Sequence, residues 1–432
     1  MSTAPATQAA TGAGLRWMEG LRYGLLGLPL AFVALPLYVL LPNYYARNVG
    51  VPLAGLGLLL LSARLLDAVV DPLLGRWADA LFARSHRHVL ACGAAAALLL
   101  LASFGALFFP PDTTLPVLWG WALACLLLCY LAFSTLTIVH QSWGALLGGD
   151  ALGRSRVVAF REGLGLLGVV LASLSPVLFG MPTTVALLGL ALLLGCWAWS
   201  RGPRPALTAT MPAPSAQPSG LGAGLLAPWG SPAFRALLAV FMVNGIATAL
   251  PATLILFFVQ DRLQAPPAME AWFLGSYLLA AALALAPWLR IVKRWGLERA
   301  WLAGMLLAVA VFAFASQLGA GDANAFLAVC VLSGMAMAAD LALPGALLAG
   351  VIARQSSAAS GRFFGWWNLA TKLNLALAAG LALPLLASFG YAPGSRSAEG
   401  LQALTWAYCL LPCALKLLAA GLLYFLLLRK SP

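Results

Sequence analysis

The segment from Ser62 to Gly75 places three ionisable side chains, Arg64, Asp67 and Asp71, in an otherwise apolar run. Residues four apart share a face of an α-helix, so Asp67 and Asp71 lie together, with Arg64 about one turn before them. Two carboxylates with one guanidinium keep a net negative charge, which suits a small cation. The alternative is a static salt-bridge network between helices, although two acids and one base do not neutralise one another.

The composition indicates that these charged residues lie in a chain embedded in lipid. Of 432 residues, 62% are hydrophobic and 9% charged, and the mean hydropathy is +0.93. Such a chain must be dissolved in lipid, where an ionisable side chain is costly and is a functional candidate by default. The seven cysteines lie in apolar stretches without metal-ligand spacing, so we expect packing roles and no resident metal.

Apolar runs of about 20 residues, each enough to cross a bilayer, follow one another along the chain. Six are predicted before a central break: Leu21 to Ala46, Pro52 to Arg76, Val89 to Phe109, Leu115 to Val139, Val157 to Gly180, and Thr183 to Ser200. Six more follow it: Ala233 to Gln260, Ala271 to Leu289, Arg299 to Leu318, Ala323 to Ile352, Phe363 to Phe389, and Leu401 to Leu428.

The break, residues 201–231, is rich in Pro, Ala, Ser and Gly and is predicted to be a cytosolic linker. The predicted organisation is a tail (1–20), a six-helix bundle (21–200), this linker, a second six-helix bundle (232–428) and a short tail (429–432). This all-α, twelve-helix arrangement is the architecture of the major facilitator fold, in which substrate binds between the halves near the midplane.

The basic residues predict the orientation. With the N-terminus inside, the cytosolic segments hold almost all of them, and the periplasmic loops hold only Arg47, Arg262 and Arg396. Positive loops stay in the cytosol, so both termini are predicted to be cytosolic in a bacterial inner membrane. The net charge of +12 then sets topology and does not indicate a nucleic-acid partner. The first twenty residues lack a signal-peptide core, so we expect no cleaved export segment.

The charged segment resembles the second helix of the glycoside-pentoside-hexuronide:cation symporters, the melibiose-permease-like branch of the major facilitator superfamily. The family pattern Arg-x-x-Asp-Ala-x-x-Asp-Pro-x-x-Gly is present as Arg64, Asp67, Ala68, Asp71, Pro72 and Gly75. In that family the two aspartates form or adjoin the site for Na⁺, Li⁺ or H⁺. The resemblance therefore implies that Asp67 and Asp71 bind the coupling cation, with Arg64 beside them.

Later segments are similar to the same family. Arg161, after Ser142-Trp-Gly-Ala-Leu and Arg154, is the counterpart of an arginine that contacts substrate as helix five begins. Asp340, followed by Gly361-Arg-Phe-Phe-Gly-Trp-Trp-Asn368-Leu-Ala-Thr-Lys372, resembles the region of helices ten and eleven, where a lysine is typical. The resemblance implies substrate-binding or coupling roles for Arg161, Asp340, Asn368 and Lys372.

Three positions leave alternatives open. Ala31 stands where sugar-binding members carry a first-helix acid, and His140 stands where helix four often carries Asp or Asn. A neutral imidazole at His140 either ligates a cation or relays a proton, or it is purely structural. Lys416 lies near the middle of the last span without an evident partner, so it snorkels to the interface or faces a cavity.

Residues Gly75 to Asp79, with Arg84 and Arg87 after them, resemble the superfamily signature between helices two and three. Gly75 and Asp79 are therefore candidates for a gating loop that latches helix ends in one state. Positive-inside anchoring alone explains the loop arginines. It does not explain Asp79.

These observations predict a secondary active transporter, a symporter that couples Na⁺ or H⁺ to a small polar solute, sugar or sugar-acid-like, by alternating access. It needs no cofactor beyond the transported cation, and its expected partners are the solute, the cation and membrane lipid, with the monomer as the functional unit. The chain has no His-Glu-x-x-His, Gly-x-Ser-x-Gly or phosphate-loop motif, so an enzyme is not expected. The rival is an uncoupled or proton-coupled carrier of a lipid, drug or organic anion.

The substrate charge follows from two features. Ala31 removes an acceptor for sugar hydroxyls, while Arg161 and Lys372 remain as donors, so an anionic solute is better matched than a neutral galactoside. This expectation fails if Glu162, Asp340 and Asp71 neutralise the bases in pairs.

Overall fold

The computed structural model is built of helices, and the part of the chain that it describes contains no β-strand. The described residues are 16–41, 44–45, 53–111, 114–147, 149–205, 225–266, 268–355, 360–389, 391 and 397–429. Among them, nine helical segments have the length and hydropathy to span a membrane. A helix pairs its backbone groups internally, and this is why apolar runs of this length fold as helices in lipid.

The first six spans form the N-terminal half. Its first span is broken into α1 (Trp17–Gly24), α2 (Gly27–Leu35) and a π-helical turn η1 (Pro36–Leu40). The remaining helices are α4 (Leu53–Arg84), α5 (His86–Phe108), α6 (Leu115–Leu147) and α7 (Ala151–Ser200). Gly180, with φ 77° and ψ 170°, breaks α7 into the fifth and sixth spans. Glycine adopts such a positive φ without a Cβ clash.

The second six spans form the C-terminal half, which follows a short 3₁₀ turn, η2 (Ala227–Gly230). Its helices are α9 (Pro232–Phe257) continued by η3 (Phe258–Arg262), α10 (Ala268–Trp295), α11 (Leu297–Ala315), α12 (Ala323–Gln355) and α13 (Ser360–Ser388). The last span comprises α14 (Ala398–Thr405), η5 (Trp406–Leu410), α15 (Leu411–Leu423) and η6 (Tyr424–Leu428). The predicted all-α fold of two six-helix halves is confirmed.

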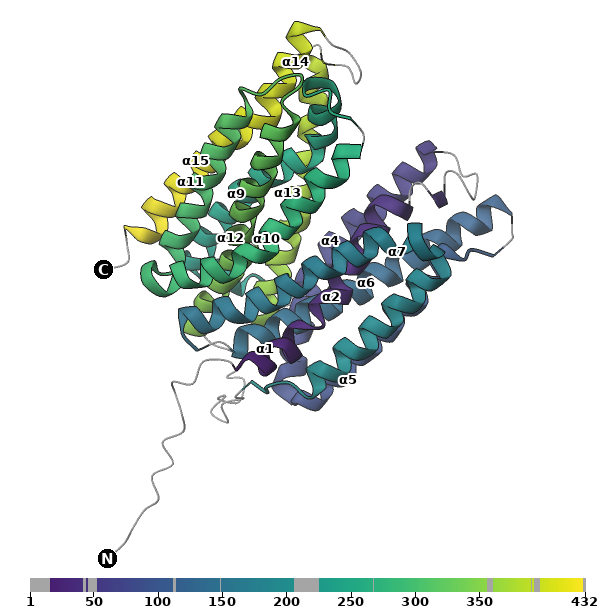
Figure 1. Cartoon of the computed structure of the whole chain (residues 1–432). Helices are drawn as coiled ribbons and strands as arrows, with labels where there is room; N and C mark the ends of the chain where they lie inside the picture. Colours follow the sequence, from purple (N-terminus) through teal and green to yellow (C-terminus); the bar gives the residue numbers. More distant parts are fainter. Residues whose placement is uncertain are drawn as a thin grey trace, which may run out of the picture.

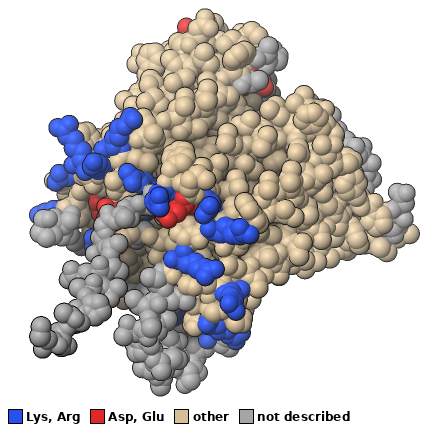
Figure 2. Space-filling view, turned by 60° about the horizontal axis from the view of Figure 1, so that its bottom comes forward, with Lys and Arg blue, Asp and Glu red and all other residues tan. Residues whose placement is uncertain are grey.

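The two halves meet at one end and diverge at the other (Figure 1). The halves are in contact through α4 with α13, α6 with α12 and α13, and α7 with α10 and α12. The Lys and Arg side chains gather on the face at the bottom of Figure 1, where the halves touch (Figure 2). We call this the basic end; Arg84, Arg294 and Arg354 stand at the ends of α4, α10 and α12.

Several sequence predictions fall on residues outside the described ones. They are Arg47, Arg396 and Lys430, most of the first tail, residues 206–224 of the predicted linker, and the last three residues of the chain.

Candidate functional site

Lys372 of α13 reaches across from the C-terminal half and lies between the two aspartates of α4. Its Nζ is 2.6 Å from Asp67 Oδ2 and 2.7 Å from Asp71 Oδ2, and it donates to Ser134 Oγ of α6 at 2.9 Å. The Ser134 hydroxyl donates in turn to Asp67 Oδ1 at 2.9 Å. We call Asp67, Asp71, Ser134 and Lys372 the inter-half cluster. It brings together three residues predicted from the sequence, Asp67, Asp71 and Lys372. The Lys372 ammonium group joins the two halves.

Asp71 is the less satisfied of the two acids. Its side chain is 0% exposed, and within the described part of the chain no donor other than Lys372 and Ser134 lies near its carboxylate oxygens. A buried carboxylate normally has several acceptor sites filled. Two carboxylates facing one ammonium also leave one negative charge. The cluster therefore has both the charge and the open acceptors to take one small cation.

The helix geometry explains why Lys372 reaches this place. Gly361, Gly365, Asn368 and Lys372 recur every three or four residues, so they form one stripe along α13. Gly365 packs on α4 so closely that a Cβ there would lie 2.6 Å from the Asp71 carbonyl oxygen. Small residues allow this approach of two helix backbones in a membrane. Asn368 lies half-buried on the stripe, and its side chain has no hydrogen-bond partner among the described residues.

A second contact closes the basic end. Asp79 of α4 accepts from the backbone N–H groups of Gly361 and Arg362, at 2.5 and 3.1 Å, and from Arg362 Nε at 2.9 Å. Next to it, a Cβ on Gly75 would lie 2.2 Å from the Gly361 carbonyl oxygen. Asp79 thus caps the first turn of α13, where an anion is stabilised by free N–H groups and by the helix dipole. Gly75 and Asp79 were predicted to lie in a gating loop, but both lie inside helix α4, which continues to Arg84. Both nevertheless touch the other half.

Two further predicted residues, Arg64 and Arg161, contact side chains outside the inter-half cluster. Arg64 is exposed and lies beside Tyr130 of α6. Arg161 is bound by its neighbour Glu162, with Nε and Nη2 at 3.0 and 2.5 Å from Oε1.

His140 joins α6 to α1. The Tyr23 hydroxyl donates to the His140 carbonyl at 3.1 Å, the His140 Nε2 lies 2.9 Å from the Tyr23 carbonyl, and the two rings stack with centroids 4.3 Å apart. These mutual contacts with Tyr23 favour a structural role for His140, although its Nδ1 has no hydrogen-bond partner within the described residues.

Lys416 has no evident partner in the sequence, but in the structure it contacts three side chains. Lys416 Nζ lies 2.7 Å from Asp340 Oδ2 and donates to Asn244 Oδ1 and Thr248 Oγ1 at 2.9 and 3.1 Å. Asp340 also accepts from Asn244 Nδ2 at 3.0 Å, Trp301 Nε1 at 2.9 Å and Thr248 Oγ1 at 3.2 Å.

We call Asn244, Thr248, Trp301, Asp340 and Lys416 the C-half cluster. Its members come from α9, α11, α12 and α15, all in one half, and Asp340 lies here rather than beside Lys372. The signal that could have revealed it is the pair Asn244 and Thr248, two polar residues four apart in an apolar span.

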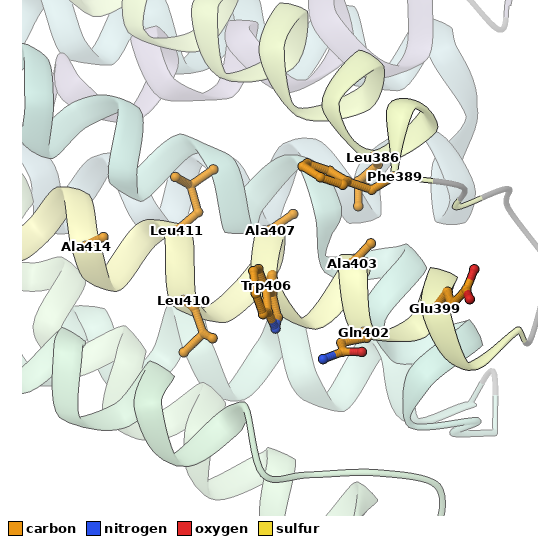
Figure 3. Close-up of a pocket in the computed structure, with 10 residues that line it drawn as sticks. All are labelled: Leu386, Phe389, Glu399, Gln402, Ala403, Trp406, Ala407, Leu410, Leu411 and Ala414. Atoms are coloured by element: carbon orange, nitrogen blue, oxygen red, sulfur yellow. The ribbon is translucent and has the colours of Figure 1, made fainter.

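A further hollow lies at the end opposite the basic end, between the close of α13 and the last span. It has a volume of about 530 Å³ and is lined mainly by apolar side chains. Figure 3 shows Ala403 and Ala407 pointing toward Leu386 and Phe389, with Glu399 at the far end. One carboxylate and one amide, Glu399 and Gln402, offer little chemistry among such side chains, so this hollow is not a candidate for the site.

The family model described as "MFS/sugar transport protein" matches residues 22–430, almost the whole chain. The chain belongs to this family of the major facilitator superfamily. Membership implies a multi-pass membrane transporter rather than an enzyme. No curated protein sequence matches it.

Solved structures share the fold at low sequence identity. A bacterial homologue of the iron transporter ferroportin, in an outward-facing state, is 15% identical with a TM-score of 0.69, covering 95% of this chain and 99% of its own. The Escherichia coli fucose:proton symporter FucP is 15% identical with a TM-score of 0.66, covering 93% and 97%. FucP in the outward conformation is 14% identical, with a TM-score of 0.64 and the same coverage.

Proposed function

We propose that this transporter is a symporter in which one Na⁺ or H⁺ binds at Asp67 and Asp71 and drives uptake of a small sugar-like solute by alternating access. The observation that carries the proposal is the inter-half cluster. It is a buried site with two acids and one base, an under-satisfied Asp71, and a base that comes from the opposite half.

The orientation proposed is the one that the loop charges indicate. Positive loops stay in the cytosol, so the basic end faces the cytosol and both termini lie there, in a bacterial inner membrane. The halves touch at this end and diverge at the other (Figure 1), so the conformation is outward-facing. The fold similarity to two structures described as outward supports this assignment.

The coupling follows from competition for the carboxylates. In the outward-facing state the Lys372 ammonium acts as a tethered cation between Asp67 and Asp71. A free Na⁺ or a proton that neutralises one carboxylate weakens the attraction of the cluster for Lys372. The bond between the halves then loosens, and the equilibrium shifts toward states in which they rearrange. A cation shifts this equilibrium only because it binds the two states unequally.

The pairing of the bases favours a neutral solute. Arg161 is bound by Glu162, Lys372 by Asp67 and Asp71, and Lys416 by Asp340. An anionic solute would have to compete with a carboxylate already in place for each base. We therefore favour a neutral sugar over its acid, which reverses the preference drawn from Ala31.

The test is uptake by the purified protein in liposomes. Labelled hexoses and pentoses, each with its uronic acid, are offered with and without an inward Na⁺ or proton gradient. We expect accumulation above equilibrium only with a gradient, with the neutral sugar preferred. Asp67→Asn and Asp71→Asn should lower accumulation to equilibrium, while Asp322→Asn, in a loop far from the cluster, should leave it unchanged.

Two outcomes decide against the proposal. If the solute inside the liposomes never exceeds its outside concentration under any gradient, the protein is an uncoupled carrier, the alternative that the sequence also allows. If both aspartate variants concentrate solute normally, the cation binds elsewhere.

A further inference from the structure

The C-terminal half contains its own cavity, of about 160 Å³, lined by residues of α9, α10, α11, α12 and the last span. Asp340, Lys416 and Thr248 of the C-half cluster stand at one end, in the middle of their spans. From there the lining continues through Ile255, Tyr277 and Phe312 toward the end opposite the basic end. The cavity is thus separate from the inter-half cluster and lies within one half.

Two tyrosine hydroxyls of this cavity have no hydrogen-bond partner in the part of the chain that the structure describes. Tyr277 and Tyr408 both line it, and neither makes a hydrogen bond with any other described residue. Tyr408 is only 3% exposed, and its ring is fixed by stacking on Phe258 with centroids 4.3 Å apart. Its hydroxyl oxygen is not fully enclosed by protein, and Tyr408 lines the cavity, so we infer that this oxygen is reached from the cavity. A buried hydroxyl without a partner is costly, and a ligand in the cavity would remove that cost.

The local backbone supports a binding role. Tyr408 lies in η5, a π-helical turn between α14 and α15, and single π-turns within α-helices occur frequently at functional sites. The widened turn places Tyr408 where the cavity meets the last span.

The ion pair at the end of the cavity excludes charged ligands. All three N–H donors of Lys416 are used, by Asn244, Thr248 and Asp340, and Asp340 accepts from four groups. The pair is neutral and has no donor to spare, so a charged ligand would stay unpaired at a high desolvation cost. Most of the remaining lining is apolar. The ligand that fits is therefore neutral.

The volume sets the size. An apolar cavity of about 150 Å³ in another protein holds one benzene molecule, so this one accommodates about six to eight non-hydrogen atoms. A hexose, with a hydroxyl on nearly every carbon, would leave most of its donors unpaired here. We propose that this cavity is a second ligand site, for a small neutral molecule with an apolar body and one hydroxyl group, of the phenol or small-alcohol class.

The experiment uses 4-fluorophenol and fluorobenzene as probes, titrated by ¹⁹F NMR into the full-length protein in nanodiscs, with protein-free nanodiscs to measure partition into lipid. We expect saturable binding of both above the lipid background, with 4-fluorophenol the tighter. Tyr408→Phe and Tyr277→Phe should each weaken 4-fluorophenol binding about two- to tenfold, the range for one hydrogen bond, and leave fluorobenzene unchanged.

A matched pair of variants tests the location. Ala252 is exposed on α9 and lines the cavity, so Ala252→Leu fills the space without disturbing a packed contact. It should abolish saturable binding, whereas Leu256→Phe, one turn along the same helix and not part of the lining, should not. The inference is overturned if neither probe saturates above the lipid background, or if binding survives Ala252→Leu unchanged.

Discussion

The inter-half cluster and the C-half cluster use the same chemistry in opposite ways. The C-half cluster pairs one acid with one base, and Asn244, Thr248 and Trp301 fill the remaining hydrogen-bonding positions. The inter-half cluster has two acids for one base, and within the described residues Asp71 has no donor beyond Lys372 and Ser134.

The two clusters also differ in what they join. The C-half cluster holds helices of one half together, so it stays intact as the halves move. The inter-half cluster has its base on one half and its acids on the other, so it must change when they separate. An ion pair whose hydrogen-bonding positions are all filled holds the helices of one half together. An ion pair with unfilled positions between the two halves is suited to bind a cation and to respond to it.

The largest effect is expected from Lys416→Met. It leaves Asp340 charged, about nine-tenths buried and without its base, and breaking a buried pair on one side costs about 3–5 kcal/mol. SDS-titration unfolding should show this loss, and adding Asp340→Asn should recover much of it. Leu417→Met, at a position 51% exposed, is the control. A loss below about 1 kcal/mol would show that the C-half cluster is not the fixed pair described here.

Lys372→Met tests the other side of the comparison. It leaves two carboxylates that a free cation can neutralise, so the variant should be less stable than wild type in choline chloride and regain stability when Na⁺, Li⁺ or acid is added. A ligand at about 100 times its dissociation constant contributes about 2.7 kcal/mol. Thermal unfolding across these ions measures the effect. Lys416→Met should regain stability in acid, which protonates the unpaired Asp340, but should not respond to Na⁺ or Li⁺. An equal response of both variants to Na⁺ and Li⁺ would erase the distinction.

Gly75→Ala tests whether the contact between α4 and α13 at the basic end holds the two halves together. The added methyl would lie 2.2 Å from the Gly361 backbone oxygen, so closure must weaken. We expect roughly a tenfold shift toward separated halves, about 1.4 kcal/mol, seen as longer distances between spin labels at Arg84 and Arg354. Gly421→Ala, which meets nothing within 4 Å, should leave the distances unchanged. Unchanged distances in Gly75→Ala would remove the gating role.

The smallest effects are expected from the neutral hydroxyls. Ser134→Ala removes one donor to Asp67 and one acceptor for Lys372, and Thr248→Val removes the equivalent group beside Asp340. Each should cost about 1 kcal/mol of unfolding free energy. Added Na⁺ should offset the loss in Ser134→Ala alone. Offset of both losses, or of neither, would contradict the assignment of the cation to the inter-half cluster.

The sequence by itself determined the features that depend on local periodicity. Hydropathy and span length gave the two six-helix halves, and the spacing of four residues put Asp67 and Asp71 on one face of α4. The motif from Arg64 to Gly75 selected the acids, and the isolated Asp79 among loop arginines was recognised as unexplained by topology alone.

Only the tertiary structure decided which faces meet. Lys372 lies 301 residues after Asp71 and Lys416 lies 76 after Asp340, and nothing in either helix specifies its partner. Periodicity fixes which residues share a face, whereas pairing depends on how twelve similar apolar helices pack, which small residues such as Gly75 and Gly361 decide by letting backbones touch. The three partners of Lys416 could therefore not be predicted from the sequence, because all of them lie on other helices.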